Sequence, residues 1–418
     1  MSHSLMIQKS VLDGGIRLVT ERIPRIRSAA LGVWVEAGVI NERREHNGIS
    51  HFVEHMVFKG TPTRGAFAIV HAIESRGGIL DAFTDRDVTC FYIHCLKEDL
   101  SLAIDLIGDM ISHPLFGEED IVTEKRVILD EIASILDIPE EWIHDAVASS
   151  LWGDHPIGYP VLGTVASISS FSQHDLFSYL RQRYCNGRVI VVAAGNVDHD
   201  RTAKQVMQSF RLPHHHDGQR LARPLTTPGM VQHETWTTSQ AHLCIGMGCP
   251  GLDDPRRYAF WIIHTVLGDG MSSRLFQNIR ERLGLTYSIY SSLELFRDAG
   301  WLTVYAACEK THLDQVVALI SHELNDLAQH GLTPVEIASA KTQLRGAVLL
   351  HHEGTVNRMT RLAQQEMIFG RLDEGLDETI AAVDRVTAAE ITEACATFLA
   401  QECRHGVLLE PRSPKRHR

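Results

Sequence analysis

Two histidines and a glutamate stand close together near the N-terminus, in the stretch His51-Phe-Val-Glu54-His55. On a helix, residues four apart lie on one side, so both imidazoles can face a single metal ion. Glu54 adjoins the second histidine and can reach a water at that ion as a general base. The spacing is that of a His-x-x-Glu-His zinc site, the inverse of the commoner order. It predicts a zinc-dependent hydrolase site, with a surface helix carrying two solvated histidines as the alternative.

A catalytic zinc ion takes three protein ligands and keeps one position for water, so a third ligand is required. The helix predicted from Asp120 to Leu136 carries Glu124 and Glu131, which are two turns apart and therefore on one face. Glu131 follows His55 by 76 residues. By spacing alone, either carboxylate can complete the ligand set.

The segments that position these residues form two similar halves. Residues 28–39 form a predicted strand, and residues 78–96 form a predicted hairpin about Asp85-Arg86-Asp87, with helices between and after them. The second half repeats this order with a strand pair, two helices, a long hairpin, further helices and a closing strand. In it the strand pair is at 231–236 and 241–249, the hairpin at 286–308 and the closing strand at 406–411.

Between these halves, periodicity is lost and Pro, Gly and basic residues collect, as in a linker. We therefore predict an α+β fold of two homologous domains, each a mainly antiparallel β-sheet packed with helices. The predicted boundaries are 1–210 for the first domain, 211–228 for the linker and 229–418 for the second domain.

The composition excludes several classes of protein. With 418 residues, 44% hydrophobic and 22% charged, the chain has the make-up of a soluble globular protein. A net charge of −12 argues against general nucleic-acid binding. No apolar run is long enough to span a membrane, and the N-terminal residues do not have the pattern of a secretory signal. The eight cysteines form no CxxC pair, so we expect reduced core residues in a cytoplasmic protein.

Several stretches together resemble the pitrilysin and insulin-degrading-enzyme family, most closely its bacterial mitochondrial-processing-peptidase-like branch. They are NGISHFVEHMVFKGT, RGGILDAFTDRDVTCFYIHC, EKRVILDEI, HPIGYPVLGT and VAAGNVD, and the family's order covers essentially the whole chain. The resemblance implies one zinc ion per chain, held by His51, His55 and Glu131. It also implies that Glu54 is the general base and that Glu124 is a supporting carboxylate beside the metal.

The second half does not repeat the zinc motif. Its corresponding helix carries His264 alone, which we interpret as a core or capping histidine. By resemblance, Arg280 and Tyr287 match a family pair that reaches the active site, where a guanidinium and a phenol can stabilise a tetrahedral oxyanion.

The strand GILDAFT resembles the family's edge strand, to which an extended substrate pairs by β-augmentation. Asp81, Ala82 and Phe83 are the predicted substrate-binding residues. The family usually has Asn where this chain has Asp81, which adds negative charge near the substrate.

These residues predict a zinc metalloendopeptidase that acts on unfolded peptides or peptide extensions, and the resemblance implies that cleavage takes place inside an enclosed chamber. The long relatives that the chain resembles contain four such domains around a chamber, so we expect a homodimer, without nucleic-acid or membrane partners. The rival hypothesis is a non-catalytic peptide-binding or assembly subunit, which the family also contains. A structural zinc protein would need a closed site of four ligands, and no fourth Cys or His stands at a suitable spacing.

Overall fold

The computed structural model describes residues 6–213, 224, 226–227, 229–372 and 375–412. The chain folds into two compact units, and each unit consists of several separate segments of the sequence. Unit 1 comprises Met1–Ile132, Pro160–Leu221 and Leu350–Asp373, and unit 2 comprises Ala133–Tyr159, Ala222–Leu349 and Glu374–Arg418. Each half of the sequence therefore contributes a segment to the unit that the other half mainly forms: residues 133–159 belong to unit 2, and residues 350–373 belong to unit 1. The predicted domains at 1–210 and 229–418 were contiguous and did not include this exchange of segments. Most of the predicted linker at 211–228 lies outside the described residues.

The sheet of unit 1 has six strands among the described residues, in the order β1-β2-β6-β3-β5-β4. Strands β2 and β6 run parallel, and the other neighbours are antiparallel. The predicted hairpin at 78–96 is confirmed as β4 and β5. The strands are β1 (Met6–Val11), β2 (Arg17–Arg22), β3 (Ser28–Val35), β4 (Ile79–Thr84), β5 (Thr89–Leu96) and β6 (Val189–Gly195).

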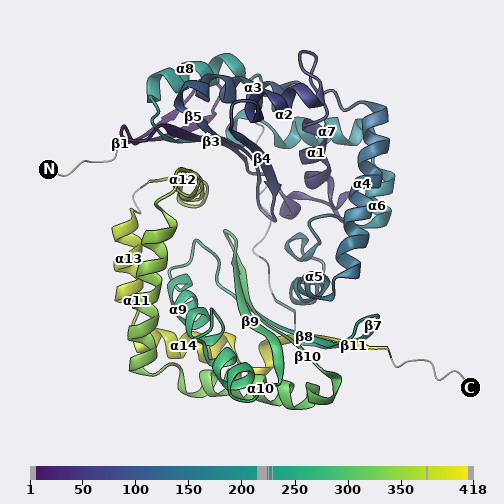
Figure 1. The fold of residues 1–418 in the computed structure, drawn as a ribbon, viewed down its shortest axis with the longest axis vertical. Coiled ribbons are helices and arrows are strands. Elements are labelled where there is room, and N and C mark those ends of the chain that lie inside the picture. The colour runs from purple at the N-terminus through teal and green to yellow at the C-terminus, as the bar shows by residue number, and fades with distance from the viewer. Residues whose placement is uncertain (1–5, 214–223, 225, 228, 373–374, 413–418) are drawn as a thin grey trace, which may run out of the picture. The chain divides into compact units, whose positions relative to one another are not determined.

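Helices cover both faces of this sheet (Figure 1). Among the described residues, one face packs against seven helices around a large apolar core. The other face packs against α12, a helix from the second half of the sequence, whose Met359 and Leu362 are buried with Trp34 and Val192 of the sheet. The helices are α1 (Ile49–Val57), α2 (Ala66–Glu74), α3 (Leu100–Ser112), α4 (Glu118–Asp137, up to residue 132), α6 (Val165–Ser170), α7 (Gln173–Arg183), α8 (His199–Ser209) and α12 (Thr355–Phe369).

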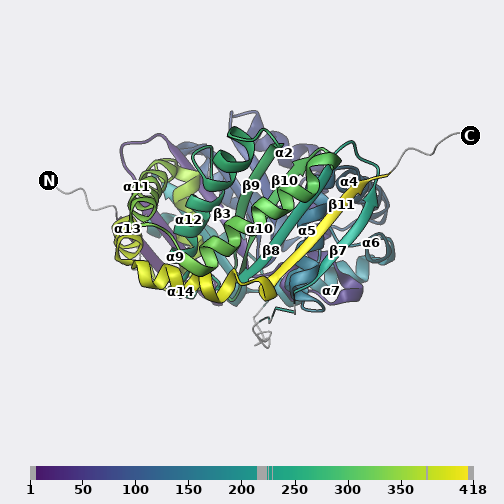
Figure 2. The same cartoon turned by 90° about the horizontal axis from the view of Figure 1, so that it is seen from below.

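The sheet of unit 2 has five strands in the part of the chain that is described, in the order β7-β11-β8-β10-β9. The predicted pairing of β7 with β8 is wrong. The last strand, β11, lies between them, parallel to β7 and antiparallel to β8 (Figure 2). Strand β6 has the same place between β2 and β3, so the two sheets share one topology. The strands are β7 (Val231–Trp236), β8 (Ala241–Cys249), β9 (Thr286–Leu295), β10 (Gly300–Cys308) and β11 (Arg404–Pro411).

The described part of unit 2 is also layered, with five α-helices on one face of its sheet and α5, from the first half of the sequence, on the other. His405 on β11 joins α5 to the sheet, because its two ring nitrogens contact the Ser150 hydroxyl at 2.8 Å and the Thr227 carbonyl at 3.0 Å. The helices are α5 (Pro139–Trp152), α9 (Arg257–Leu267), α10 (Leu313–His330), α11 (Pro334–His351, up to residue 349), α13 (Leu376–Arg385) and α14 (Ala388–Phe398).

Two duplicated α+β units, each a mainly antiparallel sheet packed with helices, confirm the predicted fold class. Among the described residues, no helix combines the length and the apolar character that crossing a membrane requires.

Candidate metal centre

Helix α1 is held at its N-terminus by a buried carboxylate. Glu42, 5% exposed, accepts hydrogen bonds from the backbone N–H groups of Gly48 at 2.7 Å and Ser50 at 2.9 Å. A carboxylate there satisfies free N–H groups and matches the positive end of the helix dipole. Gly48 has φ 91°, and a Cβ on it would lie 2.7 Å from the Leu162 carbonyl oxygen, so only glycine fits. These contacts fix where α1 begins and how it is turned.

The apolar residues of α1 orient its histidines. Phe52, Val53 and Met56 are fully buried in the core of unit 1, which leaves His51 and His55 half-buried on another side of the helix. Because they are four residues apart, their rings lie close together, with centroids separated by 4.5 Å. The helical spacing predicted for this stretch is confirmed.

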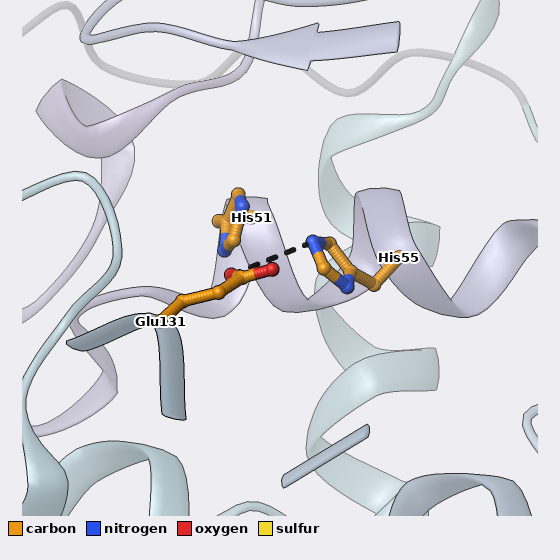
Figure 3. A group of neighbouring side chains, drawn as sticks. All are labelled: His51, His55 and Glu131. Carbon is orange, nitrogen blue, oxygen red and sulfur yellow. Dashed lines mark ion pairs between the residues drawn. The ribbon is translucent and has the colours of Figure 1, made fainter. Parts of the chain in front are cut away.

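Helix α4 brings a carboxylate to these two rings. His51, His55 and Glu131 each offer one ligand atom, and the three atoms lie within 4.8 Å of one another (Figure 3). Within the described residues, this is the one such group of His, Cys, Asp or Glu side chains. The Nε2 atom of His55 lies 3.9 Å from Oε2 of Glu131. The sequence placed these residues on two separate helices, and the structure brings them together.

The residues of this cluster fit a catalytic zinc ion. Two imidazoles and one carboxylate form a donor set found in catalytic zinc sites. The Nδ1 atom of His51 is buried and has no hydrogen-bond partner. Burial, with a smaller contribution from the charge of His55, lowers the pKa of His51 to about 3, so the ring is in the neutral form that binds metals.

Glu124 lies on the opposite side of His55. Its Oε2 atom is 3.0 Å from Nδ1 of His55, and its side chain is almost fully buried. A metal-binding histidine typically donates its second ring N–H to a carboxylate, which orients the ring. Since Nδ1 contacts Glu124, Nε2 is the nitrogen that faces Glu131. The geometry therefore gives the two carboxylates different roles, which their spacing alone left open.

Glu54 is buried beside the cluster, with 9% of its surface exposed. Its Oε2 atom accepts a hydrogen bond of 2.6 Å from the hydroxyl of Thr84, at the end of β4. Burial raises the pKa of Glu54 above its ordinary value, and the bond from Thr84 offsets part of this rise. A carboxylate with a raised pKa holds an abstracted proton more readily, as a general base must. Thr84 was not among the site residues predicted from the sequence, although it is the last residue of the GILDAFT stretch.

The predicted substrate strand, β4, is the last strand in the sheet of unit 1. Asp81 and Phe83 are exposed on one face, and Ala82 is half-buried on the other. The carboxylate of Asp81 accepts hydrogen bonds from the Tyr92 hydroxyl at 2.9 Å and the Ala82 N–H at 2.8 Å. Burial and this contact raise the pKa of Tyr92 to about 12, which keeps the phenol a donor. The edge strand thus presents an oriented carboxylate.

Arg280 and Tyr287 lie together in unit 2. The guanidinium carbon of Arg280 is 4.7 Å from the ring centroid of Tyr287 and 4.6 Å from that of Phe276. Arg280 stands in a π-helical segment, η6 (Phe276–Glu281), where the sequence predicted an ordinary helix. Such π-helical turns occur often at functional sites. Tyr287 is 79% exposed, so its hydroxyl is accessible to a ligand.

Comparison with known proteins identifies the family. Residues 17–165 match the family model described as insulinase (peptidase family M16), and residues 170–344 match the model of the M16 inactive domain. The chain belongs to peptidase family M16. The resemblance to the pitrilysin and insulin-degrading-enzyme family is therefore confirmed, while the processing-peptidase-like branch remains a prediction.

Similar M16 chains are named as zinc proteases. An uncharacterized zinc protease of Mycobacterium leprae is 39% identical over 398 residues, which cover 93% of this chain and 88% of that protein. An uncharacterized zinc protease of Bacillus subtilis is 36% identical over 389 residues, covering 92% of this chain and 94% of that one. These relatives support a zinc-dependent protease as the general class of this M16 chain.

A solved structure shares the M16 fold. The crystal structure titled peptidase M16 inactive domain from Pseudomonas fluorescens superimposes with a TM-score of 0.91, covering 99% of each chain at 18% sequence identity. At this identity, the likeness concerns the fold alone.

Proposed function

We propose that this M16 protein is a zinc-dependent endopeptidase that cleaves unfolded peptides or peptide extensions. The observation that carries the proposal is the convergence of His51, His55 and Glu131, with the buried Glu54 beside them. A non-catalytic peptide-binding subunit would not require a base at this position.

His51, His55 and Glu131 would hold one zinc ion. When bound, zinc supplies Lewis-acid chemistry, which polarises a substrate carbonyl and lowers the pKa of water. Glu54 takes a proton from the attacking water, whose oxygen forms a bond to the carbonyl carbon of the peptide. Glu54 then passes this proton to the leaving nitrogen as the C–N bond breaks, so the carboxylate is regenerated. Thr84 orients Glu54 during both transfers through its hydrogen bond.

Strand β4 would bind the substrate backbone. As the last strand of its sheet, it offers backbone N–H and C=O groups to an extended peptide. Main-chain hydrogen bonds of this kind hold many sequences, which suits an enzyme for unfolded peptides. A folded protein cannot present such a strand, so it should resist cleavage until it is unfolded.

Arg280 and Tyr287 would stabilise the oxyanion formed during attack, because a guanidinium and a phenol donate to developing negative charge. We further propose a homodimer that encloses the substrate in a chamber. Mixing the inactive Glu54→Gln and Arg280→Ala chains tests this assembly. Regained activity in the mixture would show that the pair acts between subunits, whereas a monomer with full activity at every concentration would refute the dimer.

The main test is direct. The purified chain is incubated with a library of unstructured peptides, with and without a zinc chelator, and cleavage products are identified by mass spectrometry. We expect cleavage that the chelator abolishes and added zinc restores, and we expect much slower cleavage by Glu54→Gln. Absence of chelator-sensitive cleavage in the native chain would favour the binding-subunit alternative.

A further inference from the structure

Lys59 stands at the start of a chain of contacts that ends at the candidate metal ligands. Its Nζ atom lies 2.5 Å from Oε1 of Glu124, and Oε2 of Glu124 lies 3.0 Å from Nδ1 of His55. On the other edge of the same ring, Nε2 of His55 faces Glu131 at 3.9 Å. Each oxygen of Glu124 thus has one partner, a cation on one side and an imidazole on the other.

The burial of Glu124 makes the cation important. The side chain of Glu124 is 4% exposed, whereas that of Lys59 is 31% exposed. A buried carboxylate that loses its cationic partner is left with an uncompensated desolvation cost. The side chain then moves toward solvent or toward another hydrogen-bond partner. Either response would move the oxygen that now contacts His55. Lys59 therefore acts on the ring through Glu124, without touching it.

The backbone around Lys59 supports a positioning role. Its N–H donates to the carbonyl of Met56 at 3.2 Å, which anchors Lys59 to the last turn of α1. The next carbonyl, that of Gly60, accepts from the N–H of Leu115 at 3.1 Å, in the segment that leads into α4. The Lys59–Glu124 ion pair consequently connects the end of α1 to α4, the two helices that carry His51, His55 and Glu131.

We propose that Lys59 is a positioning residue of the metal centre, which holds Glu124 against His55 and so sets the zinc affinity of the cluster. This inference rests on the proposed function, since it concerns the same site. Lys59 was not among the site residues predicted from the sequence, although it follows His55 by four residues within HMVFKGT.

The expected effect follows from known metal sites. Loss of an outer partner of a metal-binding histidine typically lowers metal affinity by 10- to 100-fold. Because Lys59 is one step further away, Lys59→Met should raise the dissociation constant for zinc on the order of 10-fold. Lys59→Arg keeps a cation at the same place and should recover most of this loss.

Lys9 offers a matched control. Its side chain is also 31% exposed and its Nζ atom lies 2.7 Å from Glu366, a carboxylate that is 1% exposed in unit 1. Lys9→Met therefore removes the same type of ion pair from a carboxylate that does not belong to the cluster of His51, His55 and Glu131. Both methionine variants remove a lysine from a buried carboxylate, although Glu366 keeps Arg17 at 3.7 Å. Only Lys59→Met should lose zinc affinity.

The experiment measures zinc dissociation constants by competition with a chelator, together with thermal unfolding of the metal-free chains. The set comprises the native chain, Lys59→Met, Lys59→Arg, Lys9→Met, Glu124→Gln and the Lys59→Met/Glu124→Gln double variant. If Lys59 acts through Glu124, adding Lys59→Met to Glu124→Gln causes little further loss.

The outcomes separate the two proposals. An equal zinc affinity in Lys59→Met and Lys9→Met, with native zinc binding intact, would overturn the role of Lys59 and leave the proposed peptidase standing. A further 10-fold loss in the double variant would overturn the route through Glu124. Absence of zinc binding in the native chain would overturn both. If Lys59→Met fails to fold, a zinc affinity of Lys59→Arg as low as that of Glu124→Gln would overturn the inference.

Discussion

Helices α1 and α9 hold similar places in the two units, yet their histidines have different surroundings. In α1, His51 has a buried Nδ1 atom with no hydrogen-bond partner, and His55 lies between Glu124 and Glu131. In α9, the Nδ1 atom of His264 contacts the hydroxyl of Ser291 at 2.7 Å. Burial lowers the pKa of His264, so this ring is a neutral partner of a neighbouring strand.

Hydrogen bonding within the protein distinguishes the candidate metal-binding histidine from the structural one. A buried polar atom normally finds a partner within the protein, and His264 has found one. The buried Nδ1 atom of His51 has no such partner, which is costly, and the carboxylate of Glu131 on α4 converges on the same pair of rings. The duplicated fold therefore supplies two equivalent helices, and only the side chains decide which one can bind metal.

The charged clusters of the two units differ in the same way. In unit 2, Arg274 contacts Glu336 at 2.6 Å, Asp326 at 2.8 Å and Glu323 at 3.7 Å, so one guanidinium holds three carboxylates. In unit 1, Glu131 faces an imidazole across 3.9 Å and is 40% exposed. The Arg274 cluster is satisfied internally and stabilises the fold, whereas the α1–α4 cluster is open to an ion.

The largest expected effect comes from Glu54→Gln. The amide has nearly the same shape but cannot accept the proton of water at neutral pH, so turnover should fall by about 10² to 10⁴. Zinc content should remain native, because the ligands are intact. His264→Gln is the matched variant in unit 2 and should keep full activity. Peptide cleavage and metal analysis check both, and an active Glu54→Gln enzyme would refute the assignment of the base.

The next effect separates Glu131 from Glu124. Glu131→Gln removes an anionic ligand, so zinc affinity should fall by about 100-fold or more, whereas Glu124→Gln should lose on the order of 10-fold. Chelator competition measures both constants. Equal losses in the two variants would contradict the distinct roles that the His55 geometry gives them.

A smaller effect concerns the edge strand. Opposite charges across neighbouring strands contribute up to about 1 kcal/mol, so Asp81 should favour peptides with a Lys or Arg next to it by up to about fivefold. Asp81→Asn should remove this preference while neutral peptides are cleaved as before. Asp105→Asn, which removes an exposed charge on α3 of the same unit, is the control. A library read by mass spectrometry measures the ratio, and an unchanged ratio in Asp81→Asn would rule out this preference.

The smallest effect tests the structural cluster of unit 2. Burial alone would raise the pKa of Glu336, but hydrogen bonds from Arg274 and Thr333 outweigh it and lower the pKa to about 2, from an ordinary value of 4.5. A lowered folded-state pKa means that Glu336 stabilises the fold above pH 4.5 and loses this contribution as the pH falls toward 2. After allowance for solvent screening, Glu336→Gln should lose about 1 kcal/mol at pH 7.

Unfolding by urea at several pH values checks this sign. The difference in unfolding free energy between the native chain and Glu336→Gln should shrink below pH 4.5 and vanish once the pH has fallen below about 2. Zinc affinity and peptide cleavage should not change, because Glu336 contacts neither the ligands nor the base. A loss of zinc from this variant would contradict the separation between a structural and a functional cluster.

Local patterns in the sequence were enough for much of this protein. The spacing of His51 and His55 places them on one side of a helix, because helical periodicity is a property of adjacent residues. The β4–β5 hairpin follows from alternating side chains and its Asp-rich turn in the same way. The corresponding helix of the second half carries His264 without a second histidine or a glutamate, which excluded a second zinc site of the His-x-x-Glu-His type. These conclusions required only neighbours along the chain, and the structure agrees with the helix and the hairpin.

Contacts between distant segments were decided by the tertiary structure. Strand β11 lies between β7 and β8. Helix α5 packs on the sheet of unit 2 and helix α12 on the sheet of unit 1, although each helix comes from the opposite half of the sequence. These apolar sheet faces must be covered, and no segment adjacent in the sequence covers them. No local pattern records which distant segment supplies that cover.

The metal centre shows the same limit. The sequence alone determined which side chains can bind zinc and on which helices they stand. Only packing of α4 against α1 decided that Glu131 faces Nε2 of His55 while Glu124 takes Nδ1, and that Lys59 reaches Glu124 from the end of α1. Glu124 and Glu131 stand on one face of a helix, so the sequence pattern cannot distinguish their roles. Their roles differ because the imidazole ring of His55 lies between them in the structure.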